Sequence, residues 1–362
     1  MTRTKTLALV VALSVARACM GPLALTALAA DAPAAGILSR GYVFGDLPTP
    51  SCHATTIAET TPGTFVVAWF GGTAEGKPDV GIWTSRLENG SWTKPVEVAT
   101  GVQADDTRHP CWNPVLFQKP GGELLLFYKV GPNPRDWWGL VRKSRDGGRS
   151  WSEPVRLSRP GTAIRGGPVG PVKNKPVRLS DGTILAGSST EYDGWRVHME
   201  RSRDGGETWE VIGPVNDGKA IGAIQPSILL LGGGRLLAVG RTLKSTRVFH
   251  IGSSDGGSSW GTMSLLDLPN PNSGTDAVTL ANGHHLLVYN HTEKGRTPLN
   301  VAHSKDGVTW TPAATLETKP GEYSYPAIIQ AADGRVHVTY TWNRKKVAHA
   351  VLDPARFATA PE

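Results

Sequence analysis

The sequence predicts an all-β protein, a six-bladed β-propeller whose blades are four-stranded antiparallel sheets. Three observations predict it: a short turn motif that recurs 50 to 59 residues apart, a finer repeat of paired apolar strands, and 43 Gly and 27 Pro among 362 residues. A fixed interval of this length is typical of repeat architectures in which each unit is one supersecondary element. So much Gly and Pro suits many strands joined by tight turns.

The turn motif is clearest at residues 202–209, which read SRDGGETW. Asp can accept hydrogen bonds from the amides that follow it, Gly accepts positive φ, and Trp covers the apolar layer beneath. We therefore expect the motif to turn the chain between the third and fourth strands of a blade. Further copies lie at 144–151 and 253–260, with a shortened one at 304–310 and a degenerate one at 85–92.

The finer repeat consists of an apolar strand, a tight turn, a second apolar strand and, after a loop, a third. It occurs six times, with turns at Pro62-Gly63, Gly121-Gly122, Asp181-Gly182, Gly233-Gly234, Asn282-Gly283 and Asp333-Gly334. The last unit has no turn motif and no fourth strand after Leu352. We predict that residues 36–44 supply this outer strand and close the ring, which also protects sheet edges from aggregation.

The turn motif is identified as the Asp box, and the chain resembles the sialidase (neuraminidase) superfamily of Asp-box, BNR-repeat proteins across nearly all of residues 31–362. The resemblance implies a six-bladed propeller in one domain. It also implies that the Asp boxes lie on turns away from the active site.

Residues 1–30 have the features of a secretory signal peptide. Arg3 and Lys5 precede an apolar run at 7–16, and small residues at 27–30 offer a cleavage site. The run is too short to span a membrane, so we expect an exported protein, periplasmic or extracellular, without stable membrane insertion. Removal of Arg3, Lys5 and Arg17 lowers the formal net charge from +7 to +4. No run of Lys or Arg remains, so no nucleic-acid partner is predicted.

Two cysteines remain after processing, Cys52 and Cys111, and they could pair in an oxidising compartment. Each has a histidine nearby, His53 and His109, but a CxxC spacing is missing, so we predict no metal site. No organic cofactor is implied.

The predicted topology gathers polar residues around one end of the propeller axis, which we call the funnel. First strands start there and second strands return there. The first strands bring His53, Arg108, His109, Lys175, Gln225, Asp276, Tyr323 and Tyr325, and the returning strands and their loops bring Asp79, Glu191, Arg241, Arg296 and Arg344. Arg binds carboxylates bidentately, so this set predicts a site for an anionic sugar.

The resemblance implies a role for several of these residues. Sialidases bind the substrate carboxylate with three arginines, use an Asp as acid/base and attack with a Tyr that a Glu activates. Along the chain of these enzymes, one arginine is followed by another in the loop before a third strand and then by a Tyr-Ser pair, and Arg241, Arg296 and Tyr323-Ser324 match that order. Asp79 stands where the acid/base is expected, and Glu75 is the alternative for that role. The first arginine is missing at Ser51-Cys52-His53, and Arg108 is the candidate replacement. Gln225 stands where the activating Glu is expected, and Glu191 and Glu322 are the candidate substitutes for it.

We therefore expect an exo-glycosidase that removes a terminal acidic sugar, sialic acid or a related one, acting as a monomer. One alternative is a lyase for uronate polysaccharides, with His53, His109 and a Tyr as the acid/base groups. Another is a propeller that binds glycans without cleaving them.

Overall fold

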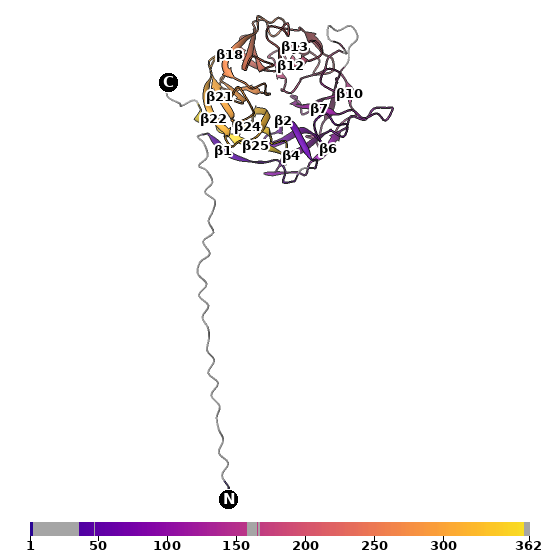
Figure 1. Cartoon of the computed structure of the whole chain (residues 1–362), viewed down its shortest axis with the longest axis vertical. Coiled ribbons are helices and arrows are strands. Elements are labelled where there is room, and N and C mark those ends of the chain that lie inside the picture. The colour runs from indigo at the N-terminus through magenta and orange to yellow at the C-terminus, as the bar shows by residue number, and fades with distance from the viewer. Residues whose placement is uncertain (3–35, 47, 158–164, 166, 358–362) are drawn as a thin grey trace. The chain divides into compact units, whose positions relative to one another are not determined.

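The computed structural model describes residues 1–2, 36–46, 48–157, 165 and 167–357, and its regular elements belong to one compact unit, Pro33–Glu362 (Figure 1). The predicted signal peptide lies almost wholly outside the described residues. Six separate sheets are present, five of four strands and one of five, all antiparallel within themselves. Within the described part of the chain, η1 (Pro354–Arg356) is the one helical turn. The predicted six-bladed propeller is confirmed.

Blades one to five run from an inner to an outer strand in chain order, and blade six takes its outer strand from the start of the chain. Blade one holds β2 (Ser51–Thr61), β3 (Thr64–Gly72) and β4 (Gly81–Glu88), with β5 (Ser91–Trp92) and β6 (Val96–Ala99) both paired to β4. Blade two holds β7 (Cys111–Gln118), β8 (Leu124–Val130), β9 (Trp138–Ser144) and β10 (Val155–Arg156). Blade three holds β11 (Val177–Arg178), β12 (Ile184–Thr190), β13 (Arg196–Ser202) and β14 (Glu210–Ile212).

The other three blades follow the same plan. Blade four holds β15 (Ala223–Gly232), β16 (Arg235–Thr242), β17 (Arg247–Ser253) and β18 (Ser264–Pro269). Blade five holds β19 (Asp276–Thr279), β20 (His285–Tyr289), β21 (Leu299–Ser304) and β22 (Thr311–Glu317). Blade six holds β23 (Tyr323–Gln330), β24 (Val336–Trp342), β25 (Lys346–Leu352) and, as its outer strand, β1 (Ile37–Tyr42). First strands of neighbouring blades touch at several boundaries, as β2 does with β7 and β23 and β19 does with β15 and β23, while β12 of blade three contacts β15. These strands therefore surround the axis.

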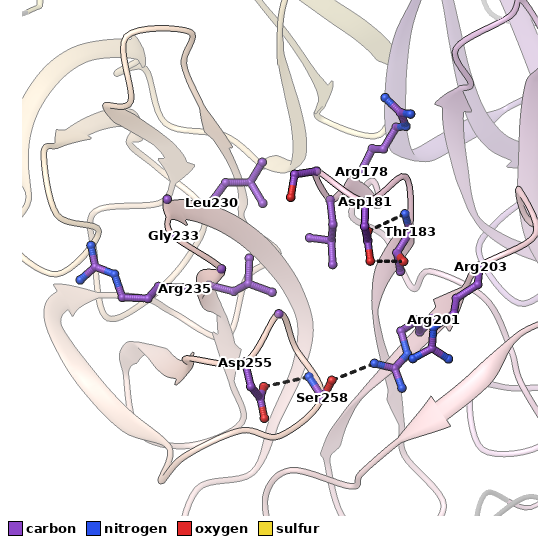
Figure 2. A pocket seen from close by; sticks show the side chains of 16 residues that line it. Arg178, Asp181, Thr183, Arg201, Arg203, Leu230, Gly233, Arg235, Asp255 and Ser258 are labelled. Carbon is purple, nitrogen blue, oxygen red and sulfur yellow. Dashed lines mark hydrogen bonds between the residues drawn. The ribbon is translucent and has the colours of Figure 1, made fainter.

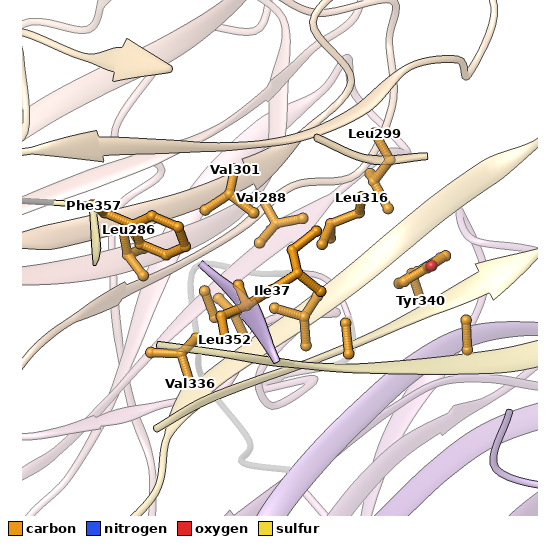
Figure 3. Close-up of a cluster of buried hydrophobic side chains, with 14 of the residues drawn as sticks. Ile37, Leu286, Val288, Leu299, Val301, Leu316, Val336, Tyr340, Leu352 and Phe357 are labelled. Atoms are coloured by element: carbon orange, nitrogen blue, oxygen red, sulfur yellow. The ribbon is translucent and has the colours of Figure 1, made fainter. Parts of the chain in front are cut away.

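Strand β1 closes the ring as predicted. It pairs antiparallel with β25, with Tyr42 opposite Ala348 and Ile37 opposite Leu352. Figure 3 shows Ile37 entering a buried cluster of blades five and six, beside Leu316 and Leu352. Strand β1 is thus joined to the last blade by hydrogen bonds and by apolar packing.

The Asp boxes form the expected turns. In the box at 202–209, Asp204 accepts hydrogen bonds from the backbone N–H groups of Glu207 (3.1 Å) and Thr208 (2.9 Å), and Ser202 Oγ accepts one from Gly206 N (2.7 Å). Burial opposes ionisation, but the hydrogen bonds from Thr208 and its neighbours outweigh it and hold the pKa of Asp204 at about 2. Trp209 is buried and meets the Phe127 ring of the preceding blade edge-on, with centroids 5.6 Å apart.

The cysteines do not form the disulfide that the sequence left open. Cys52 and Cys111 are free, and they are buried in two different apolar clusters. Burial raises the pKa of the Cys52 thiol to about 12. As for membranes, no helix among the described residues is long and apolar enough to cross one.

Replacing Ile37 by Ala should lower the free energy of unfolding by about 2–4 kcal/mol, because the change leaves a cavity between two blades. The neighbouring Leu38→Ala is a matched control, since Leu38 is 42% exposed and should cost no more than about 0.5 kcal/mol. Urea unfolding followed by Trp fluorescence measures both variants. Equal costs for the two variants would show that β1 does not contribute through this packing.

Candidate active site

Four inner strands carry an irregularity at the same point near the axis. The register shifts between His53 and Thr56, Trp112 and Val115, Ile224 and Ser227, and Ser324 and Ala327. One residue inside each shift has positive φ: Ala54 (57°), Asn113 (36°), Gln225 (59°) and Tyr325 (50°). This conformation is strained for a residue with a side chain, and β-bulges change the direction in which side chains point. Such bulges are typical of functional sites.

Tyr325 and Gln225 meet through these bulges, although they come from blades six and four. Gln225 Nε2 donates to the Tyr325 hydroxyl at 3.3 Å, and Arg241 Nη1 donates to the same oxygen at 2.7 Å. Arg241 also donates to Gln225 Oε1 at 3.2 Å. Because blade five separates these blades along the ring, the contacts cross the axis. We call the residues gathered around Tyr325 the axial cluster.

Two more arginines of the axial cluster are joined by a glutamate. Glu322 Oε1 accepts from Arg296 Nη1 (2.8 Å) and Arg344 Nε (3.0 Å), and Arg344 Nη1 also donates to Glu75 (2.6 Å). The guanidinium carbons of Arg241 and Arg296 lie 5.7 and 5.9 Å from the centroid of the Tyr325 ring. Two guanidinium groups therefore lie beside one tyrosine, and Arg344 is joined to Arg296 through Glu322.

His53 lies under this tyrosine. Its ring centroid is 4.2 Å from that of Tyr325, the side chain is buried, and Nδ1 has no hydrogen-bond partner among the described residues. Burial, together with Arg344, Arg296, Arg241 and Lys173, holds the pKa of His53 well below its usual range. The imidazole is therefore neutral at neutral pH.

The two candidate acids have opposite surroundings. Burial raises the pKa of Glu191, against the influence of Arg241 and a hydrogen bond from Trp195. Asp79 lies exposed in the loop after β3, where Thr73 donates to its carboxylate through both N (2.7 Å) and Oγ1 (2.5 Å), and these contacts lower its pKa. Glu191 is thus the carboxyl group whose surroundings favour the protonated form.

Lys175 and Asp276 were predicted to face the substrate in the funnel, but the structure buries them as a pair. Asp276 is 1% exposed and accepts hydrogen bonds from Lys175 Nζ (3.0 Å), Ser227 Oγ (2.9 Å) and Ile328 N (2.9 Å). Because these partners occupy the carboxylate, the pair ties blades three to six together. The sequence did not predict this pair because it shows which residues are charged but not how deeply their side chains are buried.

Lys173 has a similar place. Its ammonium group is buried and donates to the carbonyl oxygens of Thr275 (2.6 Å) and Pro326. Burial lowers the pKa of Lys173 to about 7, while Asp276 opposes that shift. Lys173 therefore lies near the axis, and its positive charge helps to lower the pKa of His53.

Tyr323 is separated from the axial cluster. It is buried in the apolar cluster of blades five and six, with its ring near Trp342, and burial, Glu317 and Tyr42 raise the pKa of its hydroxyl. Tyr325, two residues later, is the tyrosine that meets the arginines.

Arg108 and His109 lie toward blade two. Arg108 donates to the backbone oxygen of Asp79 (3.0 Å) and is 3.8 Å from Glu97, while the His109 ring packs edge-on against Trp138. His53 packs instead against Tyr325 and Phe70, so the two histidines have different surroundings.

Trp195 and Asn272 contact Arg241 and were not predicted. The guanidinium carbon lies 4.9 Å from the Trp195 ring centroid, and Arg241 Nε donates to Asn272 at 2.7 Å. Trp195 lies in the loop between the second and third strands of its blade. That is the same topological position as Asp79 and Arg296, so the repeat itself could have indicated it.

Comparison with known proteins agrees with this architecture. Residues 63–338 match the BNR repeat-like domain, so the chain belongs to that family and is sialidase-like. No curated protein matches the sequence.

Solved structures share the fold at low identity. A protein of unknown function from Dyadobacter fermentans superposes with a TM-score of 0.73 at 17% identity, over 88% of this chain and 98% of that one. The NanB sialidase of Streptococcus pneumoniae gives 0.71 at 12% identity, over 87% and 70% of the two chains. The Hadza microbial sialidase Hz136 gives 0.73 at 16% identity, over 85% and 67%. These likenesses establish the fold.

If Asp276 holds the blades together, Asp276→Ala should lower the free energy of unfolding by about 3–5 kcal/mol, because it leaves Lys175 as an unpaired, largely buried charge. The double variant Lys175→Met/Asp276→Leu should recover part of that loss, since no charge is left alone. Urea unfolding measures both. A cost below about 1 kcal/mol for the single variant would contradict a structural role.

Proposed function

We propose that the protein is an exo-glycosidase that removes a terminal acidic sugar, sialic acid or a related one, from glycans. The observation that carries this proposal is the Tyr325 hydroxyl, held by Arg241 and Gln225. The Arg296 guanidinium lies over the Tyr325 ring, and Glu322 joins Arg296 to Arg344. Membership of a sialidase-like family supports it. The proposal includes export, which residues 1–30 predict.

The three arginines would bind the carboxylate of the sugar. Their recorded contacts use Nε and Nη1 of Arg241 and Arg344 and Nη1 of Arg296, so among the described residues none engages Nη2. An arginine has five N–H donors, so each retains donors for a ligand. Arg344, in place of Arg108, would substitute for the missing first arginine. Its backbone oxygen accepts a hydrogen bond from Cys52 N (3.0 Å), in the stretch where that arginine is missing.

Tyr325 would attack the anomeric carbon as the glycosidic bond breaks, with its phenol proton released to solvent, and water would then hydrolyse the glycosyl-tyrosine bond to free the sugar and the tyrosine. Two N–H donors point at its oxygen, and this arrangement stabilises negative charge on an oxygen. Gln225 cannot accept the phenol proton as a Glu would, so its part is to orient the hydroxyl. This assignment moves the nucleophile from Tyr323 to Tyr325, because Tyr323 lies in the apolar cluster.

Glu191 would protonate the leaving group. A general acid must carry a proton at the working pH, and burial raises the pKa of Glu191, whereas the Thr73 contacts lower that of Asp79.

Tyr325→Phe should reduce hydrolysis of an aryl sialoside by on the order of 10³-fold or more, because the nucleophilic oxygen is gone. Tyr323→Phe is the matched control, with an expected change of less than about threefold, since that hydroxyl lies outside the axial cluster. Initial rates by absorbance measure both. Loss of activity in Tyr323→Phe with Tyr325→Phe active would overturn the assignment.

Glu191→Gln should slow cleavage of an alkyl sialoside, such as a sialyl-lactose, by about 10²–10⁴-fold. An aryl sialoside with an acidic phenol as leaving group should be affected far less, because that group departs without protonation. Asp79→Asn is the parallel variant. If Asp79→Asn shows this dependence on the leaving group and Glu191→Gln does not, Asp79 is the acid.

Glycan binding without cleavage is the second candidate function, and Gln225 favours it, because an amide stands where sialidases have the activating Glu. Absence of turnover by the wild type on aryl sialosides and aryl uronosides, with binding of the free acidic sugar retained, would establish it.

A further inference from the structure

A cavity lies between blades three and four (Figure 2). It has a volume of about 390 Å³ and is lined by the turn after β11, the turn between β15 and β16, and the Asp box at 253–260. Gln225 lies near one end of β15 and Gly232 ends it at the other, so the cavity is roughly 20 Å from the axial cluster at 3.3 Å per residue. A volume of this size is within the range of small-ligand sites.

Four arginines line this cavity: Arg178, Arg201, Arg203 and Arg235. Glu210 pairs with two of them, at 2.9 Å from Arg201 and 3.1 Å from Arg203. Arg178 and Arg235 are exposed and have no acidic partner in the described part of the chain. The positive charge left uncompensated is therefore carried by these two side chains, which Figure 2 shows on opposite sides of the cavity.

The two carboxylates of the cavity are already engaged by their own turns. Asp181 accepts from Thr183 N (2.9 Å) and Oγ1 (3.0 Å), and Asp255 accepts from Ser258 N (3.0 Å) and Ser259 N (2.9 Å). Both carboxylates accept hydrogen bonds from their own turns, and neither forms an ion pair with Arg178 or Arg235.

One part of the cavity lining is apolar, and another part has no side chains. Leu179, Leu230 and Leu236 provide an apolar surface. At residues 232–234, three consecutive glycines have positive φ, and a Cβ built on any of them would meet nothing within 4 Å. This wall therefore has no side chains, and a ligand can approach the backbone closely.

We propose that this cavity is a second, non-catalytic binding site for an acidic oligosaccharide. The cations stand apart instead of converging, so a compact anion such as phosphate would reach one of them at a time. An oligosaccharide carries its carboxylate or sulfate groups on successive rings. It can place a ring face on the leucines while its anionic groups reach Arg178 on one side and Arg235 on the other. Such a site would hold a polymeric acidic glycan on the face opposite the axial cluster.

Single-stranded nucleic acid also has spaced negative charges, but it binds by stacking bases on aromatic side chains. None of the sixteen described lining residues is aromatic. The chemistry of the cavity therefore favours the acidic glycan.

Calorimetric titration of the full mature protein with tetragalacturonate, a chondroitin sulfate tetrasaccharide and neutral maltotetraose tests the proposal. The double variant Arg178→Ser/Arg235→Ser should bind the acidic tetrasaccharides about fivefold or more weakly than the wild type. Arg145→Ser/Arg335→Ser is a matched control, because it removes the same charge from two exposed arginines outside the cavity, 88% and 60% exposed, and its binding should be unchanged. Repeating the titrations in Tyr325→Phe separates this site from turnover at the axial cluster.

Three results would overturn the proposal. They are absence of binding by the wild type to both acidic tetrasaccharides, equal weakening in the two double variants, and competition by an oligothymidylate as strong as that by the acidic glycans. The aryl sialoside assay is independent of these titrations. Loss of the second site leaves hydrolysis intact, and an inactive axial cluster leaves acidic-glycan binding at Arg178 and Arg235 intact.

Discussion

The ring depends on one recurring contact, in which a glycine of each of the four well-formed Asp boxes lies against the second strand of the preceding blade. A Cβ on Gly148, Gly206, Gly257 or Gly307 would come within 3.1, 3.1, 2.6 and 2.8 Å of Val66, Leu125, Leu185 and Leu237 respectively. All four glycines have positive φ, so a side chain is excluded by conformation as well as by space. The glycine thus lets neighbouring blades pack closely, and the Trp of the box adds apolar contact at the same boundary.

This contact explains why the Asp boxes recur although they lie away from the axis. The Asp holds the turn by accepting amide hydrogen bonds, the glycine allows close approach, and the Trp packs at the boundary between blades. Blade six has no Asp box, and there Ile37 of β1 enters the cluster shared with blade five. The ring is therefore closed by apolar packing and by the pairing of β1 with β25, where the other blade boundaries have the turn motif.

A rigid ring allows a strained and highly charged centre. The bulged residues Gln225 and Tyr325 keep positive φ because the inner strands around them are fixed on both sides. The cations near the axis are each compensated in a different way: Lys175 by a buried carboxylate, Lys173 by backbone carbonyl oxygens, and Arg344 by Glu75 and Glu322. Donors remain on the arginines around Tyr325. These free donors are what the proposed binding of an acidic sugar requires.

The sequence by itself determined the strands, the turns, the number of blades and the closing strand, because each depends on residues close together in the chain: apolar alternation, Gly in turns, and the Asp box. It also indicated most of the axial cluster, since Arg241, Arg296, Arg344, Gln225 and His53 stand at predictable ends of strands. Only the tertiary structure showed that Tyr325, and not Tyr323, is the tyrosine that contacts Arg241. Two residues apart in a regular strand they would face the same side, but the bulge between Ser324 and Ala327 separates them. It also decided that Lys175 and Asp276 are a buried pair, because burial depends on neighbours from four blades that no local pattern reveals.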